Sequence, residues 1–236
     1  MPRGLGLTLL AALALFVSTW SGPASARAVP STRVVEPSQK LAVLLSTHEA
    51  FSKPNRRSAR LGRVHARRPI TGERTVLPVL GARGGWLHVE LPGRPNGHTG
   101  WIRRTATAAR TTRWHLAVQT ASRRVFVYRG GHVIRVFKAI VGKPSTPTPH
   151  GSFFVEESIQ LRPSDVGAPF ALALSARSAV LQEFDGGPGQ IGLHGLDNVG
   201  GVLGSAVSHG CVRLSDTAMR WLVGRIGPGV RVTITR

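Results

Sequence analysis

Short apolar runs separated by turns make up the chain from residue 41 to residue 104. Between residues 86 and 91, apolar side chains alternate with His and Glu, which is the period-2 pattern of a strand with one buried face. Asn96-Gly97 then supplies the positive φ angles that a tight turn needs before the apolar run at 99–102. The pattern predicts a β-hairpin within a small β unit. Two earlier apolar runs belong to the same unit, at 41–45 and 75–80.

The period-2 pattern strengthens after Trp114. Three apolar runs joined by polar turns predict an antiparallel meander, at 114–119, 125–128 and 133–141. Residues 142–151 contain too much proline for a strand interior, and the strand pattern resumes at 152–155. One helix is expected over 215–223, where Ser215 can cap the N-terminus. With 28 Gly and 16 Pro among 236 residues, the chain is expected to be mainly β.

The first 26 residues have the pattern of a signal peptide. Arg3 precedes the apolar stretch 5–17, and Ala24-Ser25-Ala26 forms a small-x-small cleavage site. An uncleaved anchor is the alternative, but about 13 apolar residues are fewer than the ~20 that span a bilayer. We therefore expect export to the cell wall, periplasm or extracellular space. Residues 27–39 have no hydrophobic periodicity and are expected to form a linker.

Positive charge is concentrated in the N-terminal half. The chain carries 31 Lys and Arg against 11 Asp and Glu, and between Arg33 and Arg113 there are 16 against 4. Outside the cytoplasm such a surface would attract anionic wall polymers rather than nucleic acid. A fragment beginning near Arg113 should then keep its chemistry but lose wall retention. Six arginines are the candidate contacts: Arg56, Arg57, Arg60, Arg63, Arg67 and Arg68.

Cys211 is the only cysteine, so an intramolecular disulfide and a thiolate zinc cluster are excluded. In an oxidising compartment a lone thiol either packs as a small buried residue or performs chemistry. Its neighbours favour chemistry, because His194 lies seventeen residues before it and His209 two residues before it. A positioned imidazole can convert a weakly acidic thiol into a nucleophile.

Two residues beside Cys211 extend this candidate site. Gly210 removes a side chain, which would let the backbone N–H groups of Gly210 and Cys211 face a developing oxyanion. Arg213 lies two residues on, on the same strand face as Cys211, where it could bind a substrate carboxylate. The residue types therefore predict acyl transfer through a thioester.

The motifs of the C-terminal half together resemble the YkuD-type L,D-transpeptidase catalytic domain. They occur in that family's order over residues 114–236, so a catalytic domain is expected over 113–236: Val141-Gly142-Lys143, Pro147-Thr148-Pro149-His150-Gly151, His194-Gly195 and Ser208-His209-Gly210-Cys211-Val212-Arg213. The resemblance implies a β-rich enzyme without a cofactor that acts on peptidoglycan stem peptides. It would attack the bond between an L-centre and D-Ala of a tetrapeptide, release D-Ala and pass the acyl group to an amine. Carbapenem β-lactams are the implied inhibitors.

The resemblance also implies a role for each motif residue. Cys211 is the nucleophile and His194 the general base, with the Gly195 carbonyl orienting the imidazole. Ser208 and His209 support the loop, and His209 is the second candidate for the base. His150 departs from the family, which commonly has a small hydroxyl residue in that loop.

The N-terminal unit carries a weaker resemblance. Residues 86–89 followed by Gly100-Trp101-Ile102 are similar to the end of a bacterial SH3-like domain. This implies a small SH3-like β-barrel over residues 40–106. The alternative is an unrelated hairpin with two core tryptophans.

Four other functions remain as alternatives. A metal site could be built from Cys211, the two histidines and Asp197 or Asp216, but the spacing matches no known zinc motif. Papain-like and NlpC/P60-type hydrolases place the cysteine before the histidine, opposite to the order found here. A non-catalytic wall-binding protein and hydrolysis of the same stem bond are the other two.

Overall fold

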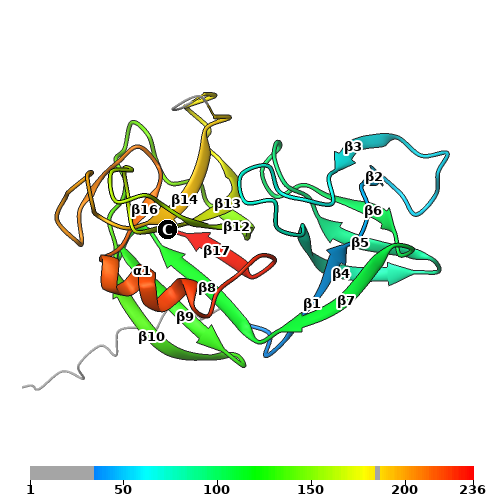
Figure 1. The fold of residues 1–236 in the computed structure, drawn as a ribbon, viewed down its shortest axis with the longest axis horizontal. Helices are drawn as coiled ribbons and strands as arrows, with labels where there is room; N and C mark the ends of the chain where they lie inside the picture. The colour runs from blue at the N-terminus through cyan, green and yellow to red at the C-terminus, as the bar shows by residue number, and fades with distance from the viewer. Residues whose placement is uncertain (1–34, 184–186) are drawn as a thin grey trace, which may run out of the picture. The chain divides into compact units, whose positions relative to one another are not determined.

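The computed structural model describes residues 35–183 and 187–236. The predicted signal peptide and most of the predicted linker lie outside this range. All described residues belong to one compact unit. They form two large β-sheets, one two-stranded sheet and one α-helix, as the mainly β prediction requires (Figure 1). Among these residues, no helix has the length and apolar character needed to cross a bilayer.

The N-terminal sheet has seven strands in the order β3-β2-β6-β5-β4-β1-β7, and every pair is antiparallel. The predicted hairpin is confirmed: residues 86–90 pair with 99–103, and Gly97 has a φ of 71°. The SH3-like barrel stays a prediction, since the pairing defines a sheet with β3 and β7 at its two ends. The strands are β1 (Gln39–Leu44), β2 (His48–Phe51), β3 (Arg60–Val64), β4 (Val76–Arg83), β5 (Trp86–Glu90), β6 (Thr99–Arg103) and β7 (Thr107–Thr112).

The second sheet has eight strands in the order β10-β9-β8-β17-β12-β13-β14-β16. The predicted meander β8-β9-β10 is confirmed, but β10 ends at Lys138, and Val141–Gly142 forms a separate strand, β11. β17 inserts between β8 and β12, parallel to β8. The strands are β8 (Trp114–Gln119), β9 (Arg124–Arg129), β10 (His132–Lys138), β12 (Gly151–Gln160), β13 (Phe170–Arg177), β14 (Gln190–His194), β16 (Val212–Arg213) and β17 (Arg231–Thr235). β11 pairs with β15 (Ala206–Ser208) in the two-stranded sheet.

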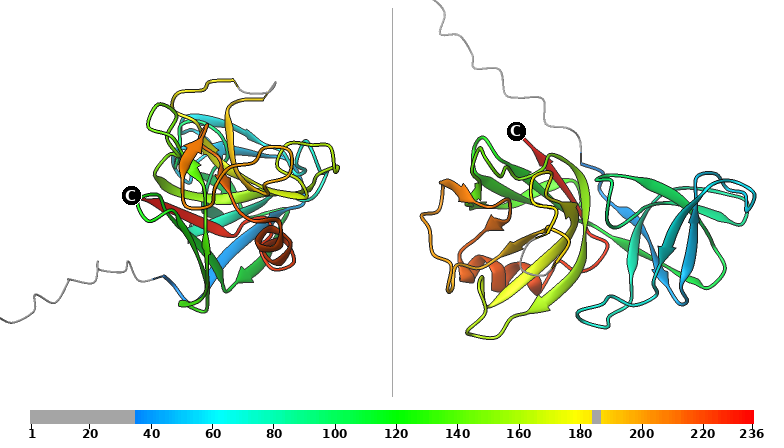
Figure 2. Two further views of the ribbon diagram at one scale, coloured as in Figure 1. Left: turned by 90° about the vertical axis from the view of Figure 1, so that its left-hand side faces the viewer. Right: turned by 90° about the horizontal axis from the view of Figure 1, so that it is seen from above.

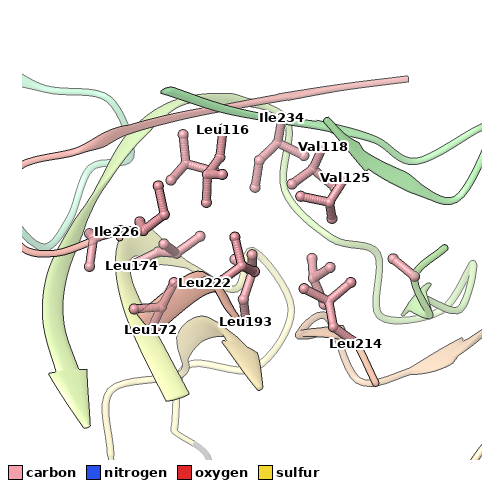
Figure 3. Close-up of a cluster of buried hydrophobic side chains, with 14 of the residues drawn as sticks. Leu116, Val118, Val125, Leu172, Leu174, Leu193, Leu214, Leu222, Ile226 and Ile234 are labelled. Atoms are coloured by element: carbon pink, nitrogen blue, oxygen red, sulfur yellow. The ribbon is translucent and has the colours of Figure 1, made fainter. Parts of the chain in front are cut away.

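The helix α1 (Asp216–Val223) lies where the sequence predicts it and contacts β13 and β14 (Figure 2). The Ala218 N–H donates to the Ser215 hydroxyl at 3.2 Å, which caps the first turn. Leu222 lies among Leu172, Leu174 and Leu193 of the sheet (Figure 3). The helix thereby covers the core next to the strand that carries His194.

β12 joins the cores of the two large sheets. Its Phe153 is buried in the core of the eight-stranded sheet, whereas Phe154, on the opposite face, is buried in the core of the N-terminal sheet. Burying one Phe side chain stabilises the fold by about 1.5–3 kcal/mol. The N-terminal sheet therefore depends on β12 for part of its core.

Buried charges occupy the same junction. Glu156 of β12 is fully buried and paired with Arg68 and with Arg177, whose closest nitrogen lies 3.3 Å away. Glu157 accepts hydrogen bonds from the Ile70 and Thr71 N–H groups at 3.2 and 2.9 Å. Arg68 was expected to contact an anionic wall, and this expectation is wrong. Its side chain is only 12% exposed and neutralises the carboxylates of β12.

Candidate active site

His194 is the last residue of β14 and lies beside the strand that follows the cysteine. β14 and β16 run parallel, with Leu193 opposite Val212 and His194 opposite Arg213. The Leu214 N–H donates to the His194 carbonyl at 2.9 Å. The His194-Gly195 motif and the cysteine motif are thus adjacent at one edge of the sheet.

The His194 ring has a defined orientation. Its Nδ1 lies 2.9 Å from the Gly195 carbonyl oxygen. A carbonyl oxygen can only accept, so Nδ1 carries the proton and Nε2 of the neutral ring keeps its lone pair. The contact expected between these two residues is present, and it leaves Nε2 as the proton acceptor.

Two glycines let the backbone approach this histidine closely. A Cβ on Gly167 would lie 2.3 Å from His194 Nδ1, and Gly167 has a φ of 84°. A Cβ on Gly195 would lie 2.0 Å from the Ala168 carbonyl oxygen. Sequence analysis missed Gly167, because no motif around it marks a residue that packs on the imidazole.

The Ser208 hydroxyl holds the cysteine loop. It donates to the Cys211 carbonyl at 2.6 Å and accepts from the Gly210 N–H at 3.2 Å. The expectation that the Gly210 N–H faces an oxyanion is therefore wrong, since this donor is already used within the loop. Gly210 is required for another reason: its φ is 121°, and a Cβ there would lie 2.9 Å from Ile191 Cδ1.

Two threonines of the proline-rich loop hold the cysteine loop in place through hydrogen bonds. Thr148 is buried, and its hydroxyl donates to the Gly210 carbonyl at 2.8 Å and accepts from the Gly142 N–H at 2.9 Å. The Thr146 hydroxyl donates to the Ser208 carbonyl at 3.2 Å. The proline content of this loop excluded a strand, but no role was predicted for its threonines. Their hydroxyl groups between prolines were the available signal.

The electrostatics favour a neutral thiol and a neutral imidazole. Burial raises the pKa of the Cys211 thiol, and the Gly192 N–H and the Arg213 charge offset only part of this rise. Burial also lowers the pKa of His194, an effect that the Gly195 contact opposes and the Arg213 charge reinforces. At neutral pH this environment disfavours a preformed thiolate–imidazolium pair.

Arg213 is partly buried on β16, beside His194. Its Nη1 donates to the Gly200 carbonyl at 3.3 Å, while its buried Nε has no hydrogen-bond partner. The guanidinium is reached by solvent at Nη1, whereas Nε is shielded. The carboxylate contact expected for Arg213 stays a prediction.

The remaining histidines near the motifs differ in exposure. His209 is exposed in the loop between Ser208 and Gly210, whereas His194 is half-buried. His150 is also exposed, and its Nε2 lies 3.0 Å from the Thr120 hydroxyl at the end of β8. The departure at His150 thus places its ring against the meander.

The metal alternative finds no site in the part of the chain that the structure describes. No cluster of three or more His, Cys, Asp and Glu residues there could hold a metal ion. Asp216 instead accepts the Leu196 N–H at 2.8 Å, at the start of α1. This contact holds the chain that follows His194 and Gly195.

A family model for the L,D-transpeptidase catalytic domain matches residues 113–234, which is over half of the chain. This chain belongs to the YkuD family. The match covers the eight-stranded sheet, the helix and both motif loops. The first half of the chain, with the N-terminal sheet, lies outside the match.

The relatives of this YkuD-family chain are named as L,D-transpeptidases. YkuD of Bacillus subtilis, provisionally named an L,D-transpeptidase, is 30% identical over 151 residues, which are 63% of this chain and 74% of that protein. L,D-transpeptidase 1 of Mycobacterium tuberculosis is 31% identical over 115 residues, 44% of this chain and 43% of the relative. A solved L,D-transpeptidase from Mycobacterium smegmatis is 18% identical, with a TM-score of 0.40 over 67% of this chain and 97% of that structure. Another, solved in complex with imipenem, has a TM-score of 0.44 at 18% identity over 68% of this chain and 90% of that structure.

Proposed function

We propose that this protein is an exported peptidoglycan L,D-transpeptidase with Cys211 as its nucleophile. The observation that carries the proposal is the hydrogen bond from His194 Nδ1 to the Gly195 carbonyl, because it leaves Nε2 as a base. The parallel pairing of β14 with β16 supports the same assignment, since it brings His194 to the strand that begins one residue after Cys211.

The first half of the reaction forms a thioester. His194 Nε2 takes the Cys211 proton as Sγ attacks the carbonyl carbon of the L-centre, and the C–N bond to D-Ala breaks. The same proton passes from His194 to the departing amine. Because the free thiol and imidazole are both neutral, proton transfer accompanies attack rather than preceding it.

The second half transfers the acyl group. An acceptor amine attacks the thioester carbon, His194 takes a proton from it, and the Cys211 thiol is regenerated. The positively charged guanidinium of Arg213, next to His194 on β16, would bind a carboxylate of the stem peptide. Thr146, Thr148 and Ser208 act by positioning, because they hold the cysteine loop and leave the reacting atoms to other groups.

Hydrolysis of the same bond is the second candidate. Water can replace the acceptor amine, because both nucleophiles attack the same thioester carbon. The two reactions share the thioester and differ only in the group that attacks it.

Mass spectrometry after incubation with purified tetrapeptide muropeptides tests the proposal. Crosslinked dimers are expected, whereas trimmed tripeptides would indicate a hydrolase and unchanged substrate a binding protein. The Cys211→Ala variant is the control. It should form neither product nor an adduct with imipenem, since no thiol remains to acylate, and an adduct at the wild-type level would overturn the role of Cys211.

A further inference from the structure

A cleft of about 760 Å³ lies between the N-terminal sheet and the end of β13. Four arginines line it: Arg63, Arg67, Arg68 and Arg177. His65 and the Pro92-Gly93 turn complete its wall. None of the described residues that line this cleft is Asp or Glu, and its size suits a ligand of moderate length.

The charges in this cleft are unbalanced. Arg68 and Arg177 are paired with the buried Glu156 and Glu157, so their charges are largely compensated. Arg63 and Arg67 are exposed, and within the described residues neither forms an ion pair with a carboxylate. The Arg67 Nη1 donates to the Gly72 carbonyl at 2.7 Å, which holds its guanidinium in place. The cleft therefore has an excess of two positive charges, one of them on an anchored side chain.

A second cleft on the same sheet shows the contrast. It is lined by Arg56, Arg60 and Arg103, but it also contains Glu49, whose carboxylate lies 3.3 Å from Arg60. The Glu49 carboxylate therefore neutralises part of the arginine charge in this second cleft. Of the two clefts, the first is the stronger candidate for an anion.

The first cleft is separate from the catalytic cysteine loop. β13 pairs with β14 so that Ala171 lies opposite His194, whereas Arg177, at the other end of β13, lies opposite Gln190. On β14 the stretch from Gln190 to His194 is four residues long, which is roughly 13 Å. Arg177 and His194 therefore lie at opposite ends of this paired stretch.

We propose that this cleft binds the phosphate groups of a polyanionic chain and so holds the protein on a phosphodiester polymer. A phosphate presents several charged oxygens and can accept from more than one guanidinium at a time, which suits neighbouring arginines with an excess of positive charge. A single carboxylate, by contrast, can be bound by two parallel N–H groups of one guanidinium, so it does not require several arginines. The inference goes beyond the proposed transpeptidase activity and does not depend on it.

Calorimetric titration of the purified protein with linear inorganic polyphosphate tests this proposal. Replacing both free arginines, in the Arg63→Ala/Arg67→Ala variant, should weaken binding at least about tenfold, the effect of losing one charge-assisted hydrogen bond. The matched control is Arg83→Ala/Arg110→Ala, which removes the same charge from exposed positions of the same sheet outside this cleft. It should change the affinity less than about twofold.

Four outcomes would overturn the proposal. Equal losses in the two double variants would mean diffuse surface attraction, and no measurable binding would remove the site. Equal binding of poly-L-glutamate through Arg63 and Arg67 would replace phosphate by carboxylate. Inorganic phosphate is titrated as a further comparison. If it binds as tightly as polyphosphate, the site binds a single ion and does not hold a polymer.

Catalysis is measured separately in the same samples. Imipenem acylation of the Arg63→Ala/Arg67→Ala variant should proceed at the wild-type rate, which also shows that the variant is folded. If the proposed transpeptidase activity fails, acylation is absent in every sample while polyphosphate binding is unchanged. The two failures are therefore distinguishable.

Discussion

The two large sheets differ in how much of their own core they supply. Twenty-one buried residues form the core of the eight-stranded sheet, and all of them come from residues 116–234. The N-terminal core has ten, and one of these, Phe154, belongs to β12 of the other sheet. A small core supports only limited stability, so the N-terminal sheet relies on its neighbour.

Their charged residues differ as well. The eight-stranded sheet carries the cysteine and histidine motifs, whereas the N-terminal half carries most of the excess arginine. Part of that arginine is structural, because Arg68 compensates Glu156 at the junction. One region thus carries the candidate catalytic motifs, while the other divides its charge between the junction and an open cleft.

Separating the two sheets should have the largest effect. A fragment that begins at Arg113 would expose Phe154 and remove Arg68 and the N–H groups that bind Glu156 and Glu157. Each lost buried contact costs about 1–3 kcal/mol, and several together approach the 5–15 kcal/mol stability of a typical domain. We expect loss of cooperative thermal unfolding and of imipenem acylation. From the sequence alone, we expected such a fragment to keep its acylation chemistry. The contacts of β12 with the N-terminal sheet lead to the opposite expectation. Wild-type acylation by a folded fragment would restore the expectation drawn from sequence.

Within the catalytic region, the two histidines should differ sharply. His194→Ala should slow acylation about 10²–10⁴-fold, the usual contribution of a general base, because Nε2 is lost. His209→Ala should have a smaller effect, since this side chain is exposed. Stopped-flow acylation rates with imipenem measure both. A larger loss in His209→Ala would transfer the role of base to that residue.

The shared core can be tested at one side chain. Phe154→Ala should destabilise the protein by about 3–5 kcal/mol, because it leaves a cavity in the N-terminal core. Val133→Ala, on the exposed face of β10, is the control and should change stability by less than about 0.5 kcal/mol. Urea unfolding followed by tryptophan fluorescence gives both values. Similar values for the two variants would argue that β12 contributes little to the N-terminal core.

The smallest effect concerns pH. Acylation requires neutral His194, and burial lowers the pKa of this residue, so activity should persist below pH 6.5 and decline only as pH falls through the lowered value. Below that point the rate should drop about tenfold per pH unit, because the base is protonated. The pH dependence of the imipenem acylation rate gives this profile. An acylation rate that begins to decline above pH 6.5 would contradict the proposal that the Cys211 thiol and the His194 imidazole are both neutral before attack.

The sequence predicted the local features of this fold well. Alternating apolar residues identified the hairpin at Asn96-Gly97 and the meander, and Ser215 identified the helix start. No strand was predicted at the positions of β2, β3, β7, β13, β14, β15 and β17. Among these, β3 is largely exposed and arginine-bearing, and β7 has weak apolar alternation. Where contacts between neighbours in the chain dominate, the pattern of residues is sufficient.

The candidate site divides in the same way. Cys211, His194 and the contact of His194 with Gly195 follow from motifs read along the chain. The use of the Gly210 N–H by Ser208, the support from Thr148 and the close approach of Gly167 do not. These depend on which loops meet, and loop contacts carry no periodic signal.

The sequence by itself determined that the chain is mainly β, that its cysteine and histidine motifs are those of the YkuD family, and that its N-terminal half is basic. Only the tertiary structure decided which arginines are free. Arg63 and Arg68 are five residues apart, yet one lines the cleft without an acidic partner and the other is buried against Glu156, eighty-eight residues away in sequence. Charge is a property of the residue, but its compensation depends on partners that only folding brings close, because electrostatic interactions act through space and not along the chain.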